Sequence, residues 1–330
     1  MPKVSIITLP FRKTHLIKPV YQAIFAQTHK DIEVIAIIND PIDGSKELLQ
    51  KEFSQVKIII PGWNTWFAVG NNIGMKESSG EFILLTNDDL ILEPNYVEKL
   101  LKDFADPRVA AATGKILRYD FKNHQKTNII DSTGLIMWEK WMTGRIRDRG
   151  QMQEDRGQFD TPDQRVVFGV TGAAAMFRRA ALEQVKFCEN GKCEYFDDDF
   201  LAYWEDADLS WRFNHAGYQC VYEHGAVCYH GRSAGQSKGG YVYFWRFIKH
   251  HRTIPAIIRR LNYKNHILMY IKNAEHLFHP GFIIRELGML GYIIIFETST
   301  LKVVPELIRL IPKFLRKRKH VMSLLKSSQT

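Results

Sequence analysis

Two groups of acidic side chains hold the residue types best suited to chemistry in this sequence. The first is Asn87-Asp88-Asp89, which directly follows the apolar run 82–85. Such a run predicts a buried strand, and open α/β sheets bind their ligands at the carboxyl ends of strands. Adjacent carboxylates repel one another unless a cation compensates them, and oxygen ligands suit Mg²⁺ or Mn²⁺ bound together with substrate phosphates. The same residue types are common in turns, so a solvated turn is the alternative interpretation.

The second acidic group is Glu205-Asp206 with Asp208, which follows the aromatic pair Tyr203-Trp204. If a helix begins here, Glu205 and Asp208 share one face while Asp206 points elsewhere. A carboxylate held between aromatic neighbours can act as a general base, because burial raises its pKa toward neutrality. The alternative is structural, since acids in the first turn of a helix are stabilised by the helix dipole alone.

A single histidine lies at the end of a later predicted strand. His230 follows the apolar stretch 226–229 and precedes a glycine-rich loop, residues 231–240. The loop carries Arg232 and Lys238, so we expect a lid whose two cations bind phosphate. A lone histidine is commonly a hydrogen-bonded structural residue, and that alternative stays open from the sequence.

Alternating strand and helix patterns position these groups. Strands are predicted at 4–8, 33–38, 56–60 and 82–85, with helical spacing of apolar residues between them and after the last. This alternation predicts an α/β fold with a Rossmann-like, mostly parallel central sheet flanked by helices. Further strands are predicted at 109–117, 128–138, 164–177, 218–222 and 226–229, with helices around 179–185 and before Gly217. We expect one domain over residues 1–238 and a helical, basic amphipathic C-terminal region over 239–330.

The positive charge is concentrated at the end of the chain. The 330 residues carry a net charge of +9, and residues 301–330 hold eight Lys or Arg side chains and one Glu. The remainder is nearly neutral, which argues against a nucleic-acid partner. Between 303 and 325, basic side chains alternate with apolar ones such as Leu307 and Phe314. This pattern predicts an amphipathic helix on an anionic membrane surface, and the alternative is a helix packed on the domain with a solvated basic face.

Cysteine usage and hydropathy predict where the chain resides. The start of the sequence shows no secretory-signal pattern, and the four cysteines Cys188, Cys193, Cys220 and Cys228 are few for this length. We therefore expect free thiols in a reducing cytoplasm, with a bridge or metal site as the alternative. The uncharged run 287–296 is too short to span a bilayer. The expected location is the cytoplasm, peripheral at the inner face of the cell membrane.

Between residues 4 and 230 the chain resembles the family 2 glycosyltransferases with the GT-A fold, and within them the rhamnosyltransferase-like branch. The resemblance rests on several short motifs in the right order and spacing. They are Val4-Ser5-Ile6-Ile7-Thr8, Asp43-Gly44-Ser45, Gly70-Asn71-Asn72-Ile73-Gly74, Leu84-Leu85-Thr86-Asn87-Asp88-Asp89, Gly172-Ala173-Ala174 followed by Arg178-Arg179, Glu205-Asp206-Ala207-Asp208-Leu209, Gly217-Tyr218 and Tyr229-His230.

The resemblance implies an inverting, metal-dependent glycosyltransferase that acts in cell-envelope glycan synthesis. Asp89 matches the last acid of the family's metal-binding triplet and His230 its later metal ligand, for Mg²⁺ or Mn²⁺. Asp206 matches the catalytic base, with Glu205 and Asp208 supporting the acceptor side. A metal neutralises the leaving nucleoside diphosphate, and a base accepts the proton of the attacking hydroxyl.

The partners implied are a nucleoside diphosphate sugar as donor and a glycan or lipid-linked acceptor. Gly172 and Trp204 are expected on the acceptor side. The residues expected at the donor are Thr8, Asn39, Asp40, Asp43, Asn71, Asn72, Asn87, Asp88, Arg232 and Lys238.

One position departs from the family pattern. The Asp that usually ends the second strand and contacts the nucleobase is replaced by Ile38, so Asn39 or Asp40 is expected to take over that contact. The departure motivates an alternative function, a non-catalytic nucleotide-sugar-binding or scaffold subunit on the same fold. A dinucleotide-dependent dehydrogenase is set aside, because residues 8–12 contain no glycine-rich turn.

Overall fold

A computed structural model describes residues 1–138, 143–231 and 244–329. The chain divides into two compact units. The first unit comprises Met1–Ile136 with Asp148–Arg232, and the second comprises Met137–Arg147 with Ser233–Thr330. The expected boundary after residue 238 lies outside the described residues.

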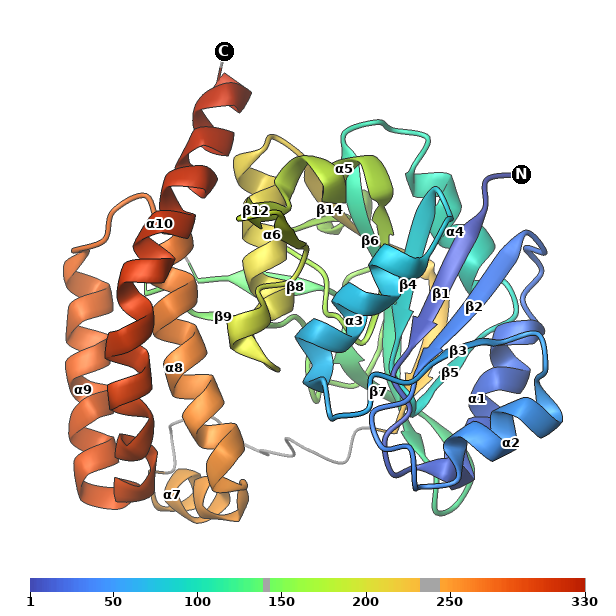
Figure 1. Cartoon of the computed structure of the whole chain (residues 1–330), viewed down its shortest axis with the longest axis horizontal. Helices are drawn as coiled ribbons and strands as arrows, with labels where there is room; N and C mark the ends of the chain where they lie inside the picture. Colours follow the sequence, from blue (N-terminus) through green and yellow to red (C-terminus); the bar gives the residue numbers. More distant parts are fainter. Residues whose placement is uncertain (139–142, 232–243, 330) are drawn as a thin grey trace. The chain divides into compact units, whose positions relative to one another are not determined.

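The first unit begins with four parallel strands in the order β3-β2-β1-β4. These strands are β1 (Val4–Thr8), β2 (Ile32–Ile37), β3 (Lys57–Ile59) and β4 (Phe82–Thr86), and they alternate with the helices α1 (Thr14–Phe25), α2 (Ser45–Glu52) and α3 (Trp66–Glu77). Every residue of β1 and β4 is buried, as a strand covered on both faces requires. The predicted α/β class and its parallel βαβ units are confirmed (Figure 1).

The sheet continues beyond β4 as a mixed sheet. Strand β11 (Ala174–Arg178) lies antiparallel between β4 and β6 (Val109–Asp120), and β14 (Gln219–His230) lies parallel to β6. Further strands pair antiparallel with these two: the short strands β5 (Leu90–Leu92) and β10 (Val166–Val167) with β14, and the longer β7 (Gln125–Ser132) with β6. The helices here are α4 (Tyr96–Asp103), α5 (Arg179–Val185) and α6 (Glu205–His215).

Strand boundaries differ from the expected ones where the backbone is irregular. The two short strands expected at 218–222 and 226–229 form the single strand β14, which is interrupted by a register shift between Glu223 and Val227. The stretch 128–138 is divided between β7 and β8 (Leu135–Met137), and β8 pairs with β9 (Ile146–Asp148). Helix α6 ends just before Gly217, whose φ of 81° is the left-handed conformation expected there.

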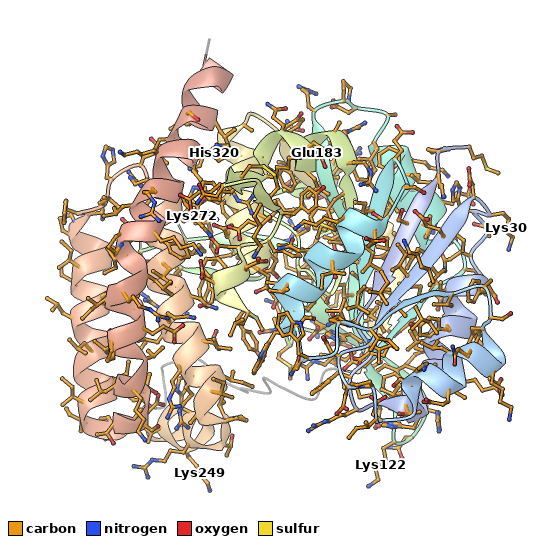
Figure 2. The ribbon with its side chains drawn as sticks, in the orientation of Figure 1. Lys30, Lys122, Glu183, Lys249, Lys272 and His320 are labelled. Carbon is orange, nitrogen blue, oxygen red and sulfur yellow. A yellow bond between two sulfur atoms is a disulfide. The ribbon has the colours of Figure 1, made fainter. Side chains whose placement is uncertain are left out.

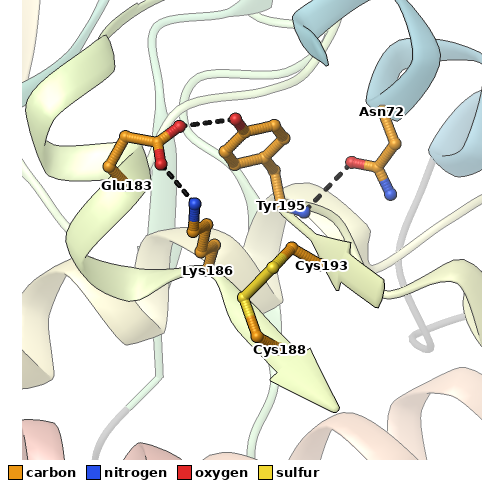
Figure 3. The surroundings of a disulfide bond; sticks show 6 residues. All are labelled: Asn72, Glu183, Lys186, Cys188, Cys193 and Tyr195. Atoms are coloured by element: carbon orange, nitrogen blue, oxygen red, sulfur yellow. Dashed lines mark hydrogen bonds and ion pairs between the residues drawn. A yellow bond between two sulfur atoms is a disulfide. The ribbon is translucent and has the colours of Figure 1, made fainter. Parts of the chain in front are cut away.

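The expectation of four free thiols is wrong for two of the cysteines. Cys188 and Cys193 form a disulfide across the hairpin of β12 (Phe187–Glu189) and β13 (Lys192–Glu194), where they are directly opposed (Figure 3). The turn between these two cysteines allows both a hairpin bridge and free thiols, so their spacing alone could not decide. Cys220 and Cys228 are free and buried.

The second unit is helical, as expected of a C-terminal extension. Its helices are α7 (Phe244–Thr253), α8 (Ala256–Asn273), α9 (Pro280–Phe296) and α10 (Val304–Gln329). Helix α10 packs along α8, burying Leu307 and Phe314. Charged side chains share this interior: Lys264 pairs with Glu306 at 2.9 Å, and Lys272, labelled in Figure 2, is 1% exposed.

Part of the amphipathic prediction for residues 303–325 therefore needs correction. Leu307 and Phe314 cover α8 and are unavailable to a membrane, because the apolar stripe they belong to faces the unit's own interior. Lys317 is likewise 1% exposed, so it is not part of a solvated basic face. Within the described residues, no individual helix combines the length and apolar character needed to cross a bilayer; α9 and the helical stretch after it meet that test only as a pair bent by 118°.

Candidate active site

The carboxyl end of β4 brings the first acidic group beside the predicted histidine. The chain leaves β4 at Thr86, passes through Asn87-Asp88-Asp89, and enters the three-residue strand β5. Strand β5 pairs antiparallel with the end of β14, so that Leu90 lies opposite His230. The N–H of Gly231 donates to the carbonyl of Asp89 at 2.9 Å and closes this pairing. Asp89 and His230, which are 141 positions apart in the sequence, are thereby held side by side.

A row of charged groups extends through the histidine. Its Nε2 lies 3.1 Å from Oδ1 of Asp89, and its Nδ1 lies 2.8 Å from Oδ2 of Asp131 on β7. Arg118 on β6 contacts the other oxygen of Asp131 at 3.4 Å. Burial by itself would lower the pKa of His230, but the hydrogen bonds with Asp131 and Asp89 outweigh burial and raise that pKa to about 9. Asp89 keeps a lowered pKa despite its burial, because His230 and Lys13 both favour its charged form.

Lys13 compensates the two adjacent acids. Its Nζ lies 2.9 Å from Oδ1 of Asp88 and 2.9 Å from Oδ2 of Asp89. The backbone N–H of Phe11 donates to the other oxygen of Asp88 at 3.0 Å. Burial opposes the charge on Lys13, yet its pKa is raised because two carboxylates face it. The cation that the Asp88-Asp89 pair requires is thus supplied by the loop after β1.

The chemistry of these atoms fits a divalent cation held by two protein ligands. Oδ1 of Asp89 is buried and faces Nε2 of His230 at 3.1 Å. Asp131 occupies Nδ1 of His230. The other ring nitrogen, Nε2, therefore directs its lone pair at the Asp89 carboxylate unless a proton or a metal ion lies between the two atoms. No group of three or more His, Cys, Asp or Glu side chains in the described part of the chain is arranged to hold a metal. Any metal here would complete its coordination with ligand oxygens, as Mg²⁺ does with phosphates.

The second acidic group begins a helix, as the sequence predicts. Asp206 lies in the first turn of α6, where its Oδ2 accepts the N–H of Gly172 at 3.1 Å and its Oδ1 accepts the N–H of Ala207 at 2.7 Å. Burial raises the pKa of Asp206 to about 6, although both backbone N–H groups oppose this shift. A carboxylate with this pKa is charged at neutral pH and close to the value that suits a general base.

A short backbone connection joins the two acidic groups. Gly172 bonds Asp206, and the carbonyl of the next residue, Ala173, accepts the N–H of Asn87 at 3.0 Å. The amide nitrogen of the Asn87 side chain lies 3.4 Å from Nε2 of His230. The predicted base, the predicted metal ligands and Gly172 are therefore neighbours at one end of β4 and β11.

The three acids of α6 have different environments. Glu205 is buried with an unbonded Oε2, and its pKa is raised well above the usual value by burial and by the charge of Asp206. Asp208 is fully buried and forms an ion pair with Arg212, 2.9 Å from its NH2. Arg212 also donates to the carbonyls of Val185 and Tyr195. Asp208 therefore anchors α6 to the body of the unit, and a direct catalytic contact is not supported by its position.

The segment before α6 is held in an uncommon conformation. Leu201, Tyr203 and Trp204 have φ values of 61°, 71° and 75°, which side chains larger than glycine adopt at a cost of about 1–3 kcal/mol each. Trp204 is the residue directly before the helix. Such conformations cluster at functional sites, and the acceptor-side position expected for Trp204 stays a prediction.

The loops after β1 and β2 hold the residues expected at the nucleotide. Asp40 accepts from Nε of Arg12 at 2.6 Å, which lowers the pKa of Asp40. Asp43 accepts the N–H of Arg12 at 2.7 Å. Asn39 is buried, and its Oδ1 accepts from both the N–H and the hydroxyl of Thr65. Asp40 is less buried than Asn39, which already orders the chain at Thr65, and the base contact expected of one of them stays a prediction. Ile38 is buried in the hydrophobic core.

Three more of the expected donor residues have protein partners. The Thr8 hydroxyl lies 2.5 Å from the Tyr21 hydroxyl, and the Asn71 amide donates to the carbonyl of Phe67. Asn72 uses all four of its hydrogen-bonding positions: its oxygen accepts the N–H groups of Tyr195 and Phe196, and its nitrogen donates to the Phe196 carbonyl and to Asp198.

The donor contact expected for Asn72 is therefore corrected to a positioning role. It holds the segment that follows the disulfide hairpin, where the Tyr195 hydroxyl also donates to Glu183 at 2.5 Å (Figure 3). Asn87 lies beside His230, and Asp88 shares Lys13 with Asp89, so both remain next to the predicted metal ligands. Arg232 and Lys238 lie outside the described residues.

Sequence reasoning missed Lys13 and Asp131. Lys13 lies in a loop with no motif of its own, and its partners are 75 and 76 positions away. Asp131 is the sole acid of β7, and the sequence of this strand contains no motif that would indicate a functional residue. The requirement for a second hydrogen bond on a ligating histidine was the one signal that could have prompted a search for Asp131.

The sequence matches a known protein family and individual known proteins. The model of Glycosyl transferase family 2 matches residues 5–186. The chain is 25% identical over 225 residues to the O-antigen biosynthesis protein RfbC of Myxococcus xanthus, covering 67% of this chain and 16% of that protein. It is 22% identical over 188 residues to the glycosyltransferase GlyA of Streptococcus pneumoniae, covering 56% of this chain and 26% of that protein. The chain thus spans about a quarter or less of the length of these two relatives.

Solved structures share the fold at low sequence identity. The mannosyltransferase PcManGT from Pyrobaculum calidifontis, in complex with GDP-Man and Mn²⁺, aligns with a TM-score of 0.52 at 14% identity, covering 99% of this chain and 87% of that one. GalNAc-T7 with UDP, GalNAc and Mn²⁺ aligns with a TM-score of 0.60 at 11% identity, covering 82% of this chain and 48% of that one. The fold of the chain is the GT-A fold of these glycosyltransferases.

Proposed function

Because the chain belongs to glycosyl transferase family 2, we propose that it moves a sugar from a nucleoside diphosphate donor to a hydroxyl group of an acceptor, with inversion at the anomeric carbon. The observation that carries this proposal is the connection from Asp206 through Gly172 and Ala173 to Asn87, beside Asp89 and His230. It supports the proposal because the candidate base Asp206 and the candidate metal ligands Asp89 and His230 lie at the same end of the sheet.

Asp89 and His230 would hold the metal, Mg²⁺ or Mn²⁺. A bound divalent cation neutralises the diphosphate and so makes it a better leaving group. Asp131 fixes the ring of His230 so that Nε2 points toward Asp89. Lys13, which already lies between Asp88 and Asp89, is positioned to add positive charge near the same phosphates.

Asp206 would accept the proton of the attacking hydroxyl. Its N–H partners at Gly172 and Ala207 hold the carboxylate in one orientation. The pKa of about 6 leaves it charged at neutral pH and able to take a proton. Glu205, whose raised pKa favours the neutral acid, would keep the surroundings of Asp206 free of a second full charge. Attack from the face opposite the diphosphate inverts the anomeric centre.

The substrates are proposed at the level of chemical class. The sugar is a hexose or rhamnose and the acceptor is a lipid-linked or polysaccharide glycan of the cell envelope, in keeping with relatives such as the O-antigen biosynthesis protein. We place the transfer at the cytoplasmic face of the membrane, with the basic C-terminal region in contact with anionic lipid. Its basic residues and the near-neutral remainder of the chain support this location.

One observation favours a second candidate, a subunit that binds nucleotide sugars without catalysis. Ile38 is fully buried at the position where the family usually has a base-contacting Asp. A non-catalytic subunit would bind sugar nucleotides or a partner but release neither sugar nor nucleotide. The presence of Asp206, Asp89 and His230 together supports the enzyme instead.

Two measurements, made one after the other, test the function. Thermal-shift screening of sugar nucleotides with and without Mn²⁺ identifies the donor, because a ligand that binds only the folded chain raises its apparent stability. Transfer to an acceptor is then compared for the wild type, Asp206→Asn and the exposed control Asp163→Asn. We expect Asp206→Asn to bind the donor and to lose transfer by at least about 10²-fold, with Asp163→Asn unchanged. Near-normal turnover by Asp206→Asn would overturn the base assignment, and donor binding without any turnover by the wild type would favour the binding subunit.

A further inference from the structure

The exposed side of α9 is apolar, whereas the exposed side of a helix that faces water is usually polar. Its most exposed side chains are Ile284, Leu287, Ile294 and Ile295, with exposed fractions between 53% and 70%. They stand at intervals of three, seven and one residues, which places them on one side of the helix. No charged residue of the described helix lies on that side.

The two charged residues of α9 point inward instead. Arg285 NH1 lies 2.8 Å from Nδ1 of His266, and Oε1 of Glu286 lies 3.1 Å from the same nitrogen. Phe282 stacks on Tyr270 of α8 with ring centroids 3.5 Å apart. The inner side of α9 is therefore partly polar and well bonded, while its outer side is apolar and exposed. A helix facing water places these two kinds of residue the other way round.

Helix α10 adds a second exposed face with a different composition. Ile308 and Leu315 are 62% and 40% exposed, and they alternate with the exposed basic residues Arg309, Arg316 and Lys319. The one acid of residues 304–325, Glu306, is partly exposed and is already paired with Lys264, so the remaining exposed charge of this stretch is basic. Apolar side chains interspersed with cations are typical of helices that lie in the headgroup region of an anionic bilayer.

We propose that α9 inserts its apolar face into the interfacial region of an anionic lipid membrane, while the exposed cations of α10 bind lipid phosphates. Helix α9 has 17 residues, about 25 Å, which is shorter than a hydrocarbon core of about 30 Å, so it lies in the interface and does not span. Charge decides between lipid and a second copy of the chain as the occupant. A symmetric contact between two copies that included α10 would bring Arg309, Arg316 and Lys319 near their own equivalents, whereas an anionic membrane complements them.

This inference deepens the proposed membrane location and is independent of the transferase chemistry. The sequence assigned both the apolar and the basic parts of the membrane contact to residues 301–330. In the structure, Leu307 and Phe314 are buried, so α9 supplies most of the apolar contact. Loss of membrane binding and loss of donor binding are separate outcomes, because donor-induced thermal shifts are measured without lipid.

Co-sedimentation of the full chain with vesicles tests the proposal. The vesicles are phosphatidylcholine alone or phosphatidylcholine mixed with phosphatidylglycerol. We expect binding to the anionic vesicles, and a loss of about tenfold or more in the triple variant Ile284→Gln, Leu287→Gln, Ile295→Gln. The variant Arg309→Gln, Arg316→Gln, Lys319→Gln should lose about fivefold for each cation and most of its salt dependence. The matched control is Ile42→Gln with Val166→Gln, which removes exposed apolar side chains from the first unit and should bind as the wild type does.

A depth-sensitive probe separates insertion from surface adsorption. The variant Leu287→Cys carries an environment-sensitive fluorophore, which is selective because Cys188 and Cys193 are bonded and Cys220 and Cys228 are buried. A blue shift of the fluorophore on anionic vesicles is the expected result. Unchanged vesicle binding in the triple α9 variant, or no shift of the fluorophore, would overturn the proposal. So would a wild type that is dimeric in sedimentation velocity and becomes monomeric in the α9 variant without ever binding vesicles.

Discussion

Nδ1 of His230 lies 2.8 Å from Oδ2 of Asp131, a residue 99 positions earlier in the chain. Both side chains are buried, and they come from β14 and β7, each of which pairs with β6. The hydrogen bond fixes the ring so that Nε2 faces Asp89. Partners of this kind are a recurring feature of histidines that bind metals.

We predict that Asp131→Ala weakens Mn²⁺ binding by about 10- to 100-fold, because the ring of His230 loses its orientation and basicity. Mn²⁺ affinity is measured by electron paramagnetic resonance in the presence of the nucleotide found by thermal shift. Asp131→Asn, which can still accept the Nδ1–H, should recover part of the loss, and exposed Asp163→Ala serves as the control. An unchanged Mn²⁺ affinity in folded Asp131→Ala would rule out this role.

Removal of the Lys13 ammonium should make the protein depend on a divalent cation for stability. Lys13→Met leaves Asp88 and Asp89 facing each other without their shared cation, which should lower the stability of the metal-free protein by about 1–3 kcal/mol. Mn²⁺ should then raise the melting temperature more in the variant than in the wild type. Lys18→Met, which breaks the exposed pair with Glu52, is the matched control and should change little. Equal Mn²⁺-induced shifts in the variant and the wild type would contradict the prediction.

Local patterns were enough to predict the strands and helices that carry the site. Buried apolar runs gave the parallel strands, and the acids at 205–208 marked the first turn of α6. The pairing of β5 with β14 could not be predicted, because β5 has only three residues and its partner lies more than 130 positions away. That pairing is what brings Asp89 to His230.

Other features could not be predicted because they depend on which side of a helix is buried. Helix α9 is apolar nearly all around, so its periodicity does not indicate its exposed face. The roles of Asp206 and Asp208 likewise differ because one faces Gly172 and the other faces Arg212, a distinction that their spacing does not contain. Asn72 resembled a donor contact by motif, yet its partners are three backbone groups and the Asp198 carboxylate, all more than 120 positions away.

The pH dependence of transfer should show the titration of Asp206. Its pKa of about 6 predicts that kcat/KM falls about tenfold for each pH unit below that value, because the protonated acid cannot accept a proton. The profile is measured at saturating Mn²⁺, with Asp163→Asn as the control, which should have the same profile as the wild type. A profile that stays flat down to pH 4.5 would exclude Asp206 as the base.

Asp206 should also lower the stability of the folded protein at neutral pH. Its folded pKa of about 6 lies above the usual value of about 3.9 for a free Asp side chain, so folding disfavours the charged form. The resulting penalty is absent below about pH 4, grows between about pH 4 and pH 6, and is nearly constant above that, on the order of 3 kcal/mol. Asp206→Asn should therefore raise the urea midpoint at pH 7.5 and leave it nearly unchanged at pH 4. The same gain at both pH values would show that the effect does not come from the charge.

The buried pair of Asp208 and Arg212 should be the most sensitive of the ion pairs on helices. Both side chains are at most 1% exposed, and they are four residues apart on α6. Asp208→Asn leaves the guanidinium of Arg212 buried without its counter-charge, so we expect a loss of about 3–5 kcal/mol in the free energy of unfolding, measured by urea denaturation. Glu98→Gln on α4 is the matched control, because Glu98 and Lys102 have the same spacing at 3.9 Å but are exposed, and it should cost about 0.5 kcal/mol or less. If the two variants lose similar amounts, the anchoring role of Asp208 is wrong, and a catalytic role for this acid would again need to be considered.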